Sequence, residues 1–375
     1  MVRIAHIADV HLGAPCSYLG DKAGLRRKDF ENTFERVIDI CLNPENRINA
    51  LVIAGDLFDT VNPPSALVGF VQKNISRLTE KGIPVILVPG THDAYGYTQS
   101  VYKMYHFSGA DILCSPTLTI VTKEISGKKV FFYGMAYTPG FSGNPFESFA
   151  LIQEEGIHIG IIHGSLEQPS HWEKREQDLS ISGDDVACSN LDYLALGHYH
   201  TFQQNQFGKT LAVYPGSLEG KTFSEQGERF MVIVDFAAKT PVLEKRAVNT
   251  RNITSVELSV DEYPCESQED LINLIKSRVD PESVVELSIK GTSEFLIDNA
   301  FLEQVLSDTS FYIRVKDETT MAESSLVKSW ERERTIRGMF TAKLLERIAK
   351  ASAEEKPILE EALKIGITQF RKVSP

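Results

Sequence analysis

The 375-residue sequence lacks the features that membrane proteins and disulfide-rich proteins require. No apolar run approaches the roughly 18 to 20 residues of a membrane helix, and the chain begins with a strand-like segment instead of a basic and then apolar leader. Its five cysteines are an odd number without close spacing, so neither a disulfide framework nor a thiolate metal site is indicated. We therefore expect a cytoplasmic protein without membrane contact.

Positive charge is also scarce. The formal net charge is −12 at pH 7, whereas nucleic-acid-binding domains usually carry a basic footprint. Residues 321–375 hold eleven Lys and Arg against eight Asp and Glu, a balance of +3 that leaves −15 for the first 320 residues. Bulk charge therefore cannot supply affinity for a polyanion. One local basic cluster is either a binding patch or a solvated helix face: Lys22, Arg26, Arg27 and Lys28.

Five short motifs rich in Asp, His and Gly are the most informative segments present. Each follows an apolar run with the length and β-branched content of a buried strand. Because polar residues at strand ends gather at one edge of an α/β sheet, the motifs predict a single site. They are Asp9-Val10-His11, Gly55-Asp56-Leu57-Phe58-Asp59, Gly90-Thr91-His92-Asp93, His163-Gly164 and Gly197-His198-Tyr199-His200.

The imidazole and carboxylate groups of these motifs predict a metal centre. Without thiolates, the set suits Mn²⁺, Fe or Zn²⁺ and selects none of them alone. Six groups are too many for one tetrahedral ion, whereas two ions about 3.5 to 4 Å apart, bridged by one carboxylate, would use them all. Asp56 is the natural bridge. The six candidate ligands are Asp9, His11, Asp56, His163, His198 and His200.

The motifs and their order resemble those of the calcineurin-like metallophosphoesterases. The surrounding residues resemble one branch, the SbcD-like nuclease subunits of DNA double-strand-break repair complexes, over roughly residues 1–236. The segments that carry this resemblance are 9–13 (DVHLG), 54–59 (AGDLFD), 191–200 (LDYLALGHYH) and 214–219 (YPGSLE). The resemblance implies an α/β fold of four layers, in which two packed β-sheets are flanked by helices. It also implies two Mn²⁺ ions as cofactors, with other divalent ions as alternatives, and DNA as substrate.

The same resemblance implies how the ligands are divided. The first ion would be held by Asp9, His11, Asp56 and His200. The second would share Asp56 and add His163, His198 and Thr91. Family members have Asn where this chain has Thr91, and a neutral hydroxyl is a shorter and weaker ligand that we expect to reach the ion only through a water. Two interpretations stay open: a second site that fills at high Mn²⁺, or a DNA-binding subunit with reduced hydrolysis.

His92 and Asp93 are the predicted catalytic residues. By resemblance, His92 would act as general acid on the leaving oxygen or stabilise the transition state, and Asp93 would orient its ring. Asp59 would either support the site or cap the next helix. The remaining histidines are expected to be structural or to lie on the surface: His6, His106, His158 and His171.

The predicted elements divide the chain into three parts. Residues 1–250 form the nuclease domain, residues 251–320 a small α+β capping domain, and residues 321–375 a helical tail. In SbcD-like proteins a comparable unit caps the nuclease and contacts DNA. Lys290, Arg314 and Lys316 could make that contact here, and scattered surface charge is the alternative.

The tail is expected to hold two helices, at about 326–351 and 353–370. The apolar stripe from Trp330 to Ile348 is larger than a lone helical hairpin can bury. It either folds back on the capping domain or binds a partner, for which the resemblance implies an SbcC-like coiled-coil ATPase subunit. A second copy of the chain is the other candidate partner.

Three classes of function follow. The favoured one is a Mn²⁺-dependent DNA exonuclease or endonuclease subunit that hydrolyses phosphodiester bonds in double-strand-break repair. A generic metallophosphodiesterase or phosphatase would share the metal core, but small substrates do not need the capping domain and the tail. A weakly catalytic DNA-binding scaffold is the third class, because Thr91 replaces the usual Asn ligand.

Overall fold

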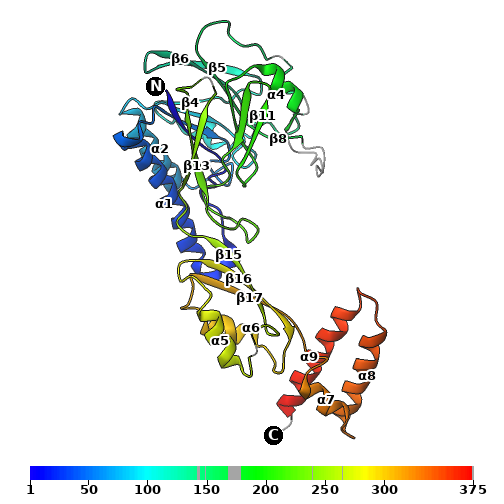
Figure 1. Cartoon of the computed structure of the whole chain (residues 1–375). Helices are drawn as coiled ribbons and strands as arrows, with labels where there is room; N and C mark the ends of the chain where they lie inside the picture. Colours follow the sequence, from blue (N-terminus) through cyan, green and yellow to red (C-terminus); the bar gives the residue numbers. More distant parts are fainter. Residues whose placement is uncertain (142–143, 148, 168–178, 239, 264, 374–375) are drawn as a thin grey trace. The chain divides into compact units, whose positions relative to one another are not determined.

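The chain forms two compact units, Met1–Arg251 and Asn252–Pro375 (Figure 1). The computed structural model describes residues 1–141, 144–147, 149–167, 179–238, 240–263 and 265–373. The second unit contains both the predicted capping domain and the predicted tail, so the three-part division stays a prediction. Among the described helices, none is both long and apolar enough to cross a membrane.

The first sheet of unit Met1–Arg251 has six strands in the order β14-β13-β1-β2-β3-β4. Strands β1 to β4 run parallel, and β13 and β14 extend the sheet with antiparallel pairings. Every residue of β2 and β3 is buried, as expected for the continuous apolar strands of a sheet covered on both faces. The strands are β1 (Arg3–Ile7), β2 (Ala50–Ala54), β3 (Val85–Val88), β4 (Ala110–Ile112), β13 (Phe230–Asp235) and β14 (Val242–Ala247).

The second sheet also has six strands, in the order β11-β12-β10-β7-β6-β5. Its central strands run parallel, and the edge strands β5 and β11 are antiparallel to their neighbours. The strands are β5 (Thr119–Ile125), β6 (Lys128–Met135), β7 (Ile157–His163), β10 (Tyr193–Gly197), β11 (Gln203–Phe207) and β12 (Thr210–Tyr214). A separate pair joins β8 (Ser165–Leu166) to β9 (Ser180–Ile181).

The two sheets pack face to face around one apolar core. Val52 of the first sheet lies in the same buried cluster as Phe132 and Ile159 of the second. Helices α1 (Ala23–Leu42) and α2 (Ser65–Thr79) connect the first three strands and lie along the first sheet (Figure 1). Helix α4 (Gly183–Ser189) places Val186 in the cluster on the outer face of the second sheet. The predicted four-layer arrangement is therefore confirmed.

Unit Asn252–Pro375 combines a parallel three-stranded sheet with helices. Strands β15 (Ile253–Ser259), β16 (Val284–Thr292) and β17 (Tyr312–Thr320) form the sheet. Its core includes Leu271 of α5 (Gln268–Lys276) and Leu302 of α6 (Asn299–Val305). The predicted mixture of strands and helices is present, and strands and helices alternate around a parallel sheet, which is the α/β arrangement.

The helical region beyond residue 324 differs from the prediction of one long first helix. Two helices, α7 (Ser325–Glu331) and α8 (Ile336–Lys350), replace it, and α9 (Lys356–Val373) follows. The break occurs because Thr335 adopts an extended conformation and its side chain accepts a hydrogen bond from the Gly338 N–H, which starts a new helix.

Most of the cations proposed for DNA contact have ordinary structural partners. Arg26 is fully buried and pairs with Glu219 at 2.8 Å, so it belongs to the core and not to a basic patch. In the second unit, Lys290 pairs with Glu257, and Arg314 and Lys316 pair with Glu286. These pairs favour the alternative interpretation of ordinary surface charge.

The histidines outside the motifs have structural surroundings where they are described. His6 is buried beside the Tyr193 hydroxyl, and burial lowers its pKa to about 3. His158 lies 2.8 Å from the Tyr133 hydroxyl, and His106 is exposed. His171 lies outside the described residues.

Candidate metal centre

The loops that carry the five motifs meet where the two sheets face each other. Each loop follows the carboxyl end of a parallel strand: β1, β2 or β3 in the first sheet, β7 or β10 in the second. The Asp9 N–H donates to the Gly55 carbonyl at 3.1 Å, and the Gly164 N–H donates to the Gly197 carbonyl at 3.1 Å. These bonds hold neighbouring loops together, so the side chains converge as the strand pattern predicted.

The backbone around the cluster is strained at four predicted ligands. Asp9, His11, Asp56 and His198 have φ values of 51°, 50°, 51° and 110°, in a region that residues with a Cβ rarely occupy. Such conformations cost roughly 1–3 kcal/mol each and persist where the surroundings enforce them, most often at functional sites. A Cβ at Gly197 would lie 1.9 Å from the Ala54 carbonyl oxygen, so the loops approach too closely for any other residue.

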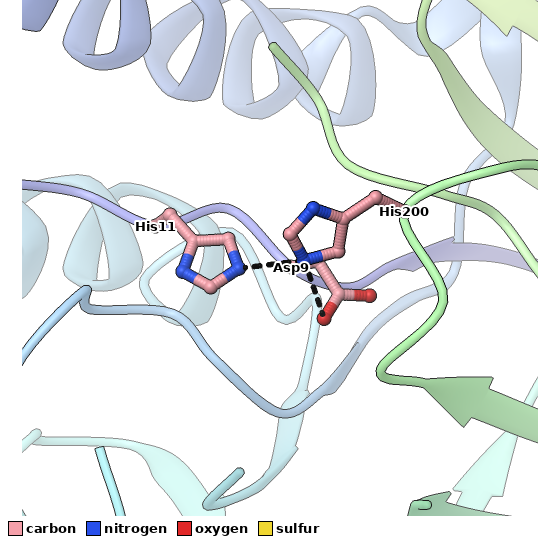
Figure 2. A group of neighbouring side chains, drawn as sticks. All are labelled: Asp9, His11 and His200. Atoms are coloured by element: carbon pink, nitrogen blue, oxygen red, sulfur yellow. Dashed lines mark hydrogen bonds and ion pairs between the residues drawn. The ribbon is translucent and has the colours of Figure 1, made fainter. Parts of the chain in front are cut away.

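Asp9, His11 and His200 form the first group of candidate ligands (Figure 2). Their ligand atoms lie within 4.8 Å of one another. The Nε2 atoms of His11 and His200 are 3.1 Å apart, and His200 Nε2 lies 3.9 Å from Asp9 Oδ1. Asp9 and His11 are fully buried, whereas the side chain of His200 is 26% exposed. The group therefore opens toward solvent beside His200.

Hydrogen bonds at Nδ1 fix the orientation of three imidazole rings. His163 Nδ1 lies 3.0 Å from the Ala54 carbonyl, which can only accept, so Nδ1 carries the proton. His11 Nδ1 lies 3.0 Å from Asp59 Oδ1, and His200 Nδ1 lies 3.2 Å from Glu225 Oε1. With the proton on Nδ1, the lone pair of each Nε2 is left for a metal.

Asp9, Asp56 and His163 form a second group around the predicted bridge. His163 Nε2 is buried, lies 3.4 Å from Asp56 Oδ2, and has no hydrogen-bond partner among the described residues. Burial by itself lowers the pKa of His163, but the charge of Asp56 outweighs it and raises that pKa to about 10. A divalent cation would replace this proton. A buried nitrogen without a hydrogen-bond partner, beside further oxygen and nitrogen donors, fits a divalent metal ion.

His198 contributes its backbone to the centre, and its ring lies beside that of His163. Its N–H donates to both carboxylate oxygens of Asp9, at 3.1 and 3.0 Å. Its ring centroid lies 5.3 Å from that of His163. The structure therefore brings His198 beside the second group, although its ring belongs to none of the close ligand groups of the described residues.

Thr91 contacts the predicted bridge directly. Its hydroxyl donates to Asp56 Oδ2 at 3.1 Å, and the His92 backbone N–H donates to Asp56 Oδ1 at 2.8 Å. The Gly90-Thr91-His92 turn thus orients both oxygens of the bridging carboxylate. Ligation of a metal by Thr91 itself stays a prediction.

Asp93 occupies a different place from the one predicted. It is fully buried and accepts hydrogen bonds from the Gly90 N–H, the Phe58 N–H and the Tyr102 hydroxyl. Burial and the charge of Asp56 raise its pKa to about 6. These contacts fold the loop instead of orienting the His92 ring, because the turn at Gly90 directs Asp93 back into the protein.

Asp59, and not Asp93, lies beside the Nδ1 atom of His92. The His92 Nδ1 atom lies 3.2 Å from the Asp59 carbonyl oxygen, and the His92 side chain is 44% exposed at the mouth of the cluster. His92 also packs against His11, with 4.7 Å between ring centroids. Of the two roles considered for Asp59, its contacts favour support of the site.

Two supporting residues were not found from the sequence. Lys221 Nζ lies 2.6 Å from Asp59 Oδ1 and 3.2 Å from His11 Nδ1, and Glu225 supports His200. Both lie in the loop that follows Glu219, outside the five motifs. Only the folding of this loop against the centre reveals their role.

Comparison with known families identifies the class of this site. The model of the calcineurin-like phosphoesterase family matches residues 2–202, which is more than half of the chain. The chain belongs to this family, and its site is that of a metal-dependent phosphoesterase. The predicted family resemblance is confirmed.

Curated relatives extend the likeness beyond the matched region. The chain is 28% identical over 324 residues to "DNA double-strand break repair protein Mre11" of Methanosarcina mazei, which covers 84% of this chain and 50% of that protein. It is 24% identical over 388 residues to the Mre11 of Saccharolobus solfataricus, covering 97% and 95%. It is 28% identical over 352 residues to "Uncharacterized metallophosphoesterase YhaO" of Bacillus subtilis, covering 84% and 81%. The chain spans about half the length of the two Methanosarcina relatives.

Substitution of the bridge should empty the whole centre. We expect Asp56→Ala to abolish binding of both Mn²⁺ ions, because both would share this carboxylate. Elemental analysis after gel filtration measures the metal retained per chain. Asp192→Ala is the matched control, since Asp192 lies at the opposite end of β10 and should leave metal binding intact. Two equivalents of metal in Asp56→Ala would contradict the assignment.

Restoring the amide at position 91 should strengthen the second metal site. We expect Thr91→Asn to lower the Mn²⁺ concentration for half-occupancy of the weaker site, because an amide oxygen reaches farther than a hydroxyl. Isothermal titration with Mn²⁺ gives both affinities. If the titration curves of the two proteins overlay, Thr91 or its water is already an adequate ligand.

Proposed function

We propose that the chain is a Mn²⁺-dependent DNA nuclease subunit that hydrolyses phosphodiester bonds in double-strand-break repair. The observation that carries this proposal is the convergence of carboxylates and imidazoles from five strand ends, with His92 exposed at the mouth. The names of the Mre11 relatives support DNA repair as its setting. The extra unit Asn252–Pro375 supports a macromolecular substrate over a small phosphate ester.

The ligand residues would hold two ions, which when bound polarise a phosphodiester and supply an activated water. His92 would act from the open side of the centre. Its Nδ1–H faces the Asp59 carbonyl, so in the protonated ring Nε2–H is free to donate to the leaving oxygen. Lys221 would hold Asp59, and through it the orientation of His11.

The structure also supports a second candidate, a DNA-binding scaffold with weak hydrolysis. The Thr91 hydroxyl donates to Asp56 Oδ2 at 3.1 Å, and a neutral hydroxyl is a shorter and weaker metal ligand than the Asn amide of family members. A substrate comparison separates these functions from that of a small-molecule phosphatase.

Turnover of three substrates tests the proposal. We expect Mn²⁺-loaded protein to hydrolyse linear DNA and bis(p-nitrophenyl) phosphate, and to leave p-nitrophenyl phosphate nearly untouched. His92→Gln should lower the rate on both diesters by about 10²- to 10⁴-fold with metal content unchanged, as for loss of a positioned acid. His106→Gln, at an exposed histidine, is the matched control. A scaffold would bind DNA without cleaving it, and a phosphatase would prefer the monoester.

We further propose that the helical region binds a coiled-coil ATPase of the SbcC type. Part of the apolar stripe is buried within the unit. Trp330, Leu344 and Ile348 pack in one cluster with two residues of α9, Leu363 and Ile367. Phe340 and Leu345 also pack against this cluster, whereas Ile336 and Met339 of the stripe are exposed. Four large apolar side chains are open to solvent on α8 and α9: Ile336 (75%), Met339 (66%), Ile358 (69%) and Ile365 (55%).

A charge placed at the exposed Met339 of α8 should prevent capture of the ATPase. We expect Met339→Glu to reduce co-purification by at least tenfold, because an interface anchor would become a buried, unpaired carboxylate. Met104→Glu provides the matched control, since Met104 is 63% exposed in the other unit. Full retention of the partner by Met339→Glu would place the interface elsewhere.

A further inference from the structure

A pocket adjoins the metal centre beside His200. Its volume is about 300 Å³, at the lower end of the range of small-ligand sites, about 300 to 1,000 Å³. His200, Phe202, Arg229 and Phe230 are among its lining residues. The pocket therefore has room for one nucleotide unit next to a candidate metal ligand.

Arg229 supplies a buried positive charge to this pocket. Arg229 is only 6% exposed, and its Nη1–H donates to the His200 carbonyl at 2.7 Å. Its Nε–H has no hydrogen-bond partner among the described residues. Glu225 and Glu219 lie close enough to affect its pKa, and the exposed Glu228 also lines the pocket. The Arg229 guanidinium therefore keeps an N–H group that can donate to a ligand, although these carboxylates lie nearby.

Phe202 and Phe230 line this pocket, and a second cation, Lys245, lies over their rings without lining the pocket itself. Lys245 Nζ lies 4.7 Å from the ring centroid of Phe202 and 4.8 Å from that of Phe230. No carboxylate in the described part of the chain pairs with Lys245, although its neighbour Glu244 pairs with Arg3 and Arg246. Lys245 is also exposed, so its charge is available to an anion.

We propose that this pocket binds an unpaired nucleotide of the DNA strand, next to the phosphodiester at the metal centre. Aromatic rings that stack on bases, together with cations that neutralise phosphates, are the two devices by which proteins hold single strands. A base within a duplex is already stacked and cannot reach such a ring. Phe202 and Phe230 would contact the base, and Lys245 and Arg229 the phosphate. The inference rests on the proposed nuclease function and assigns part of its substrate specificity.

Binding without catalysis gives the first test. A fluorescein-labelled deoxythymidine hexamer is titrated with protein in EDTA, so that no hydrolysis occurs, and anisotropy gives Kd. We expect Lys245→Gln and Phe230→Leu each to raise Kd by about tenfold, a loss in keeping with one base or phosphate contact. Lys128→Gln is the matched control, because Lys128 is an exposed cation at the opposite end of the second sheet. Equal Kd values for the pocket variants and the control overturn the proposal.

Two further measurements separate this inference from the proposed function. With Mn²⁺, the ratio of kcat/KM for thymidine 5′-(p-nitrophenyl phosphate) to that for bis(p-nitrophenyl) phosphate should fall about tenfold in the pocket variants. An unchanged ratio overturns the nucleotide site while the nuclease function stands. If the natural protein hydrolyses neither diester, the proposed function fails, and the hexamer titration still decides the pocket. Lys245→Gln alters only an exposed side chain, so its result holds even if Phe230→Leu unfolds.

Discussion

The buried carboxylate of Asp56 is the group on which the arrangement of the site depends. It is 2% exposed, and an isolated charge at that depth would cost several kcal/mol. Burial alone would raise its pKa, but the neighbouring His163 holds that pKa well below its usual range. The Thr91 hydroxyl and the His92 backbone N–H also bind its oxygens. Three loops from both sheets are thus fixed around one negative charge.

The strained backbone follows from the same constraint. Asp9 and Asp56 both take left-handed conformations two residues after the end of a β-strand, where the loops that carry the candidate ligands meet. The cost of roughly 1–3 kcal/mol for each is tolerated because backbone hydrogen bonds between the two loops hold them in place: the Asp9 N–H donates to the Gly55 carbonyl, and the His11 N–H donates to the Asp56 carbonyl. The sandwich core therefore stabilises a geometry that the loops would not adopt by themselves.

A second set of contacts holds the loop that carries Lys221 and Glu225. Glu219 is fully buried, pairs with Arg26 of α1 and accepts from the Thr33 hydroxyl. This anchors the loop that carries Lys221 and Glu225, whose side chains hold Asp59 and His200. Removal of one partner from a buried ion pair is generally far more costly than loss of a surface pair. The basic cluster that looked like a DNA-binding patch thus includes a cation that holds the site in place.

The sequence alone determined most of the long strands and the strand-end location of the candidate ligands, because buried strands and the Asp and His motifs that follow them are local patterns. It also predicted helices in the region after residue 324. It did not predict the break before α8, where the Thr335 side chain caps a new helix. Only the tertiary structure decided three features of the site. Asp59, and not Asp93, lies beside His92. Lys221 and Glu225 contact Asp59 and His200, and a pocket lies beside Phe202 and Phe230. Each joins residues that are far apart in the chain, and their meeting depends on how two sheets pack, which no local pattern records.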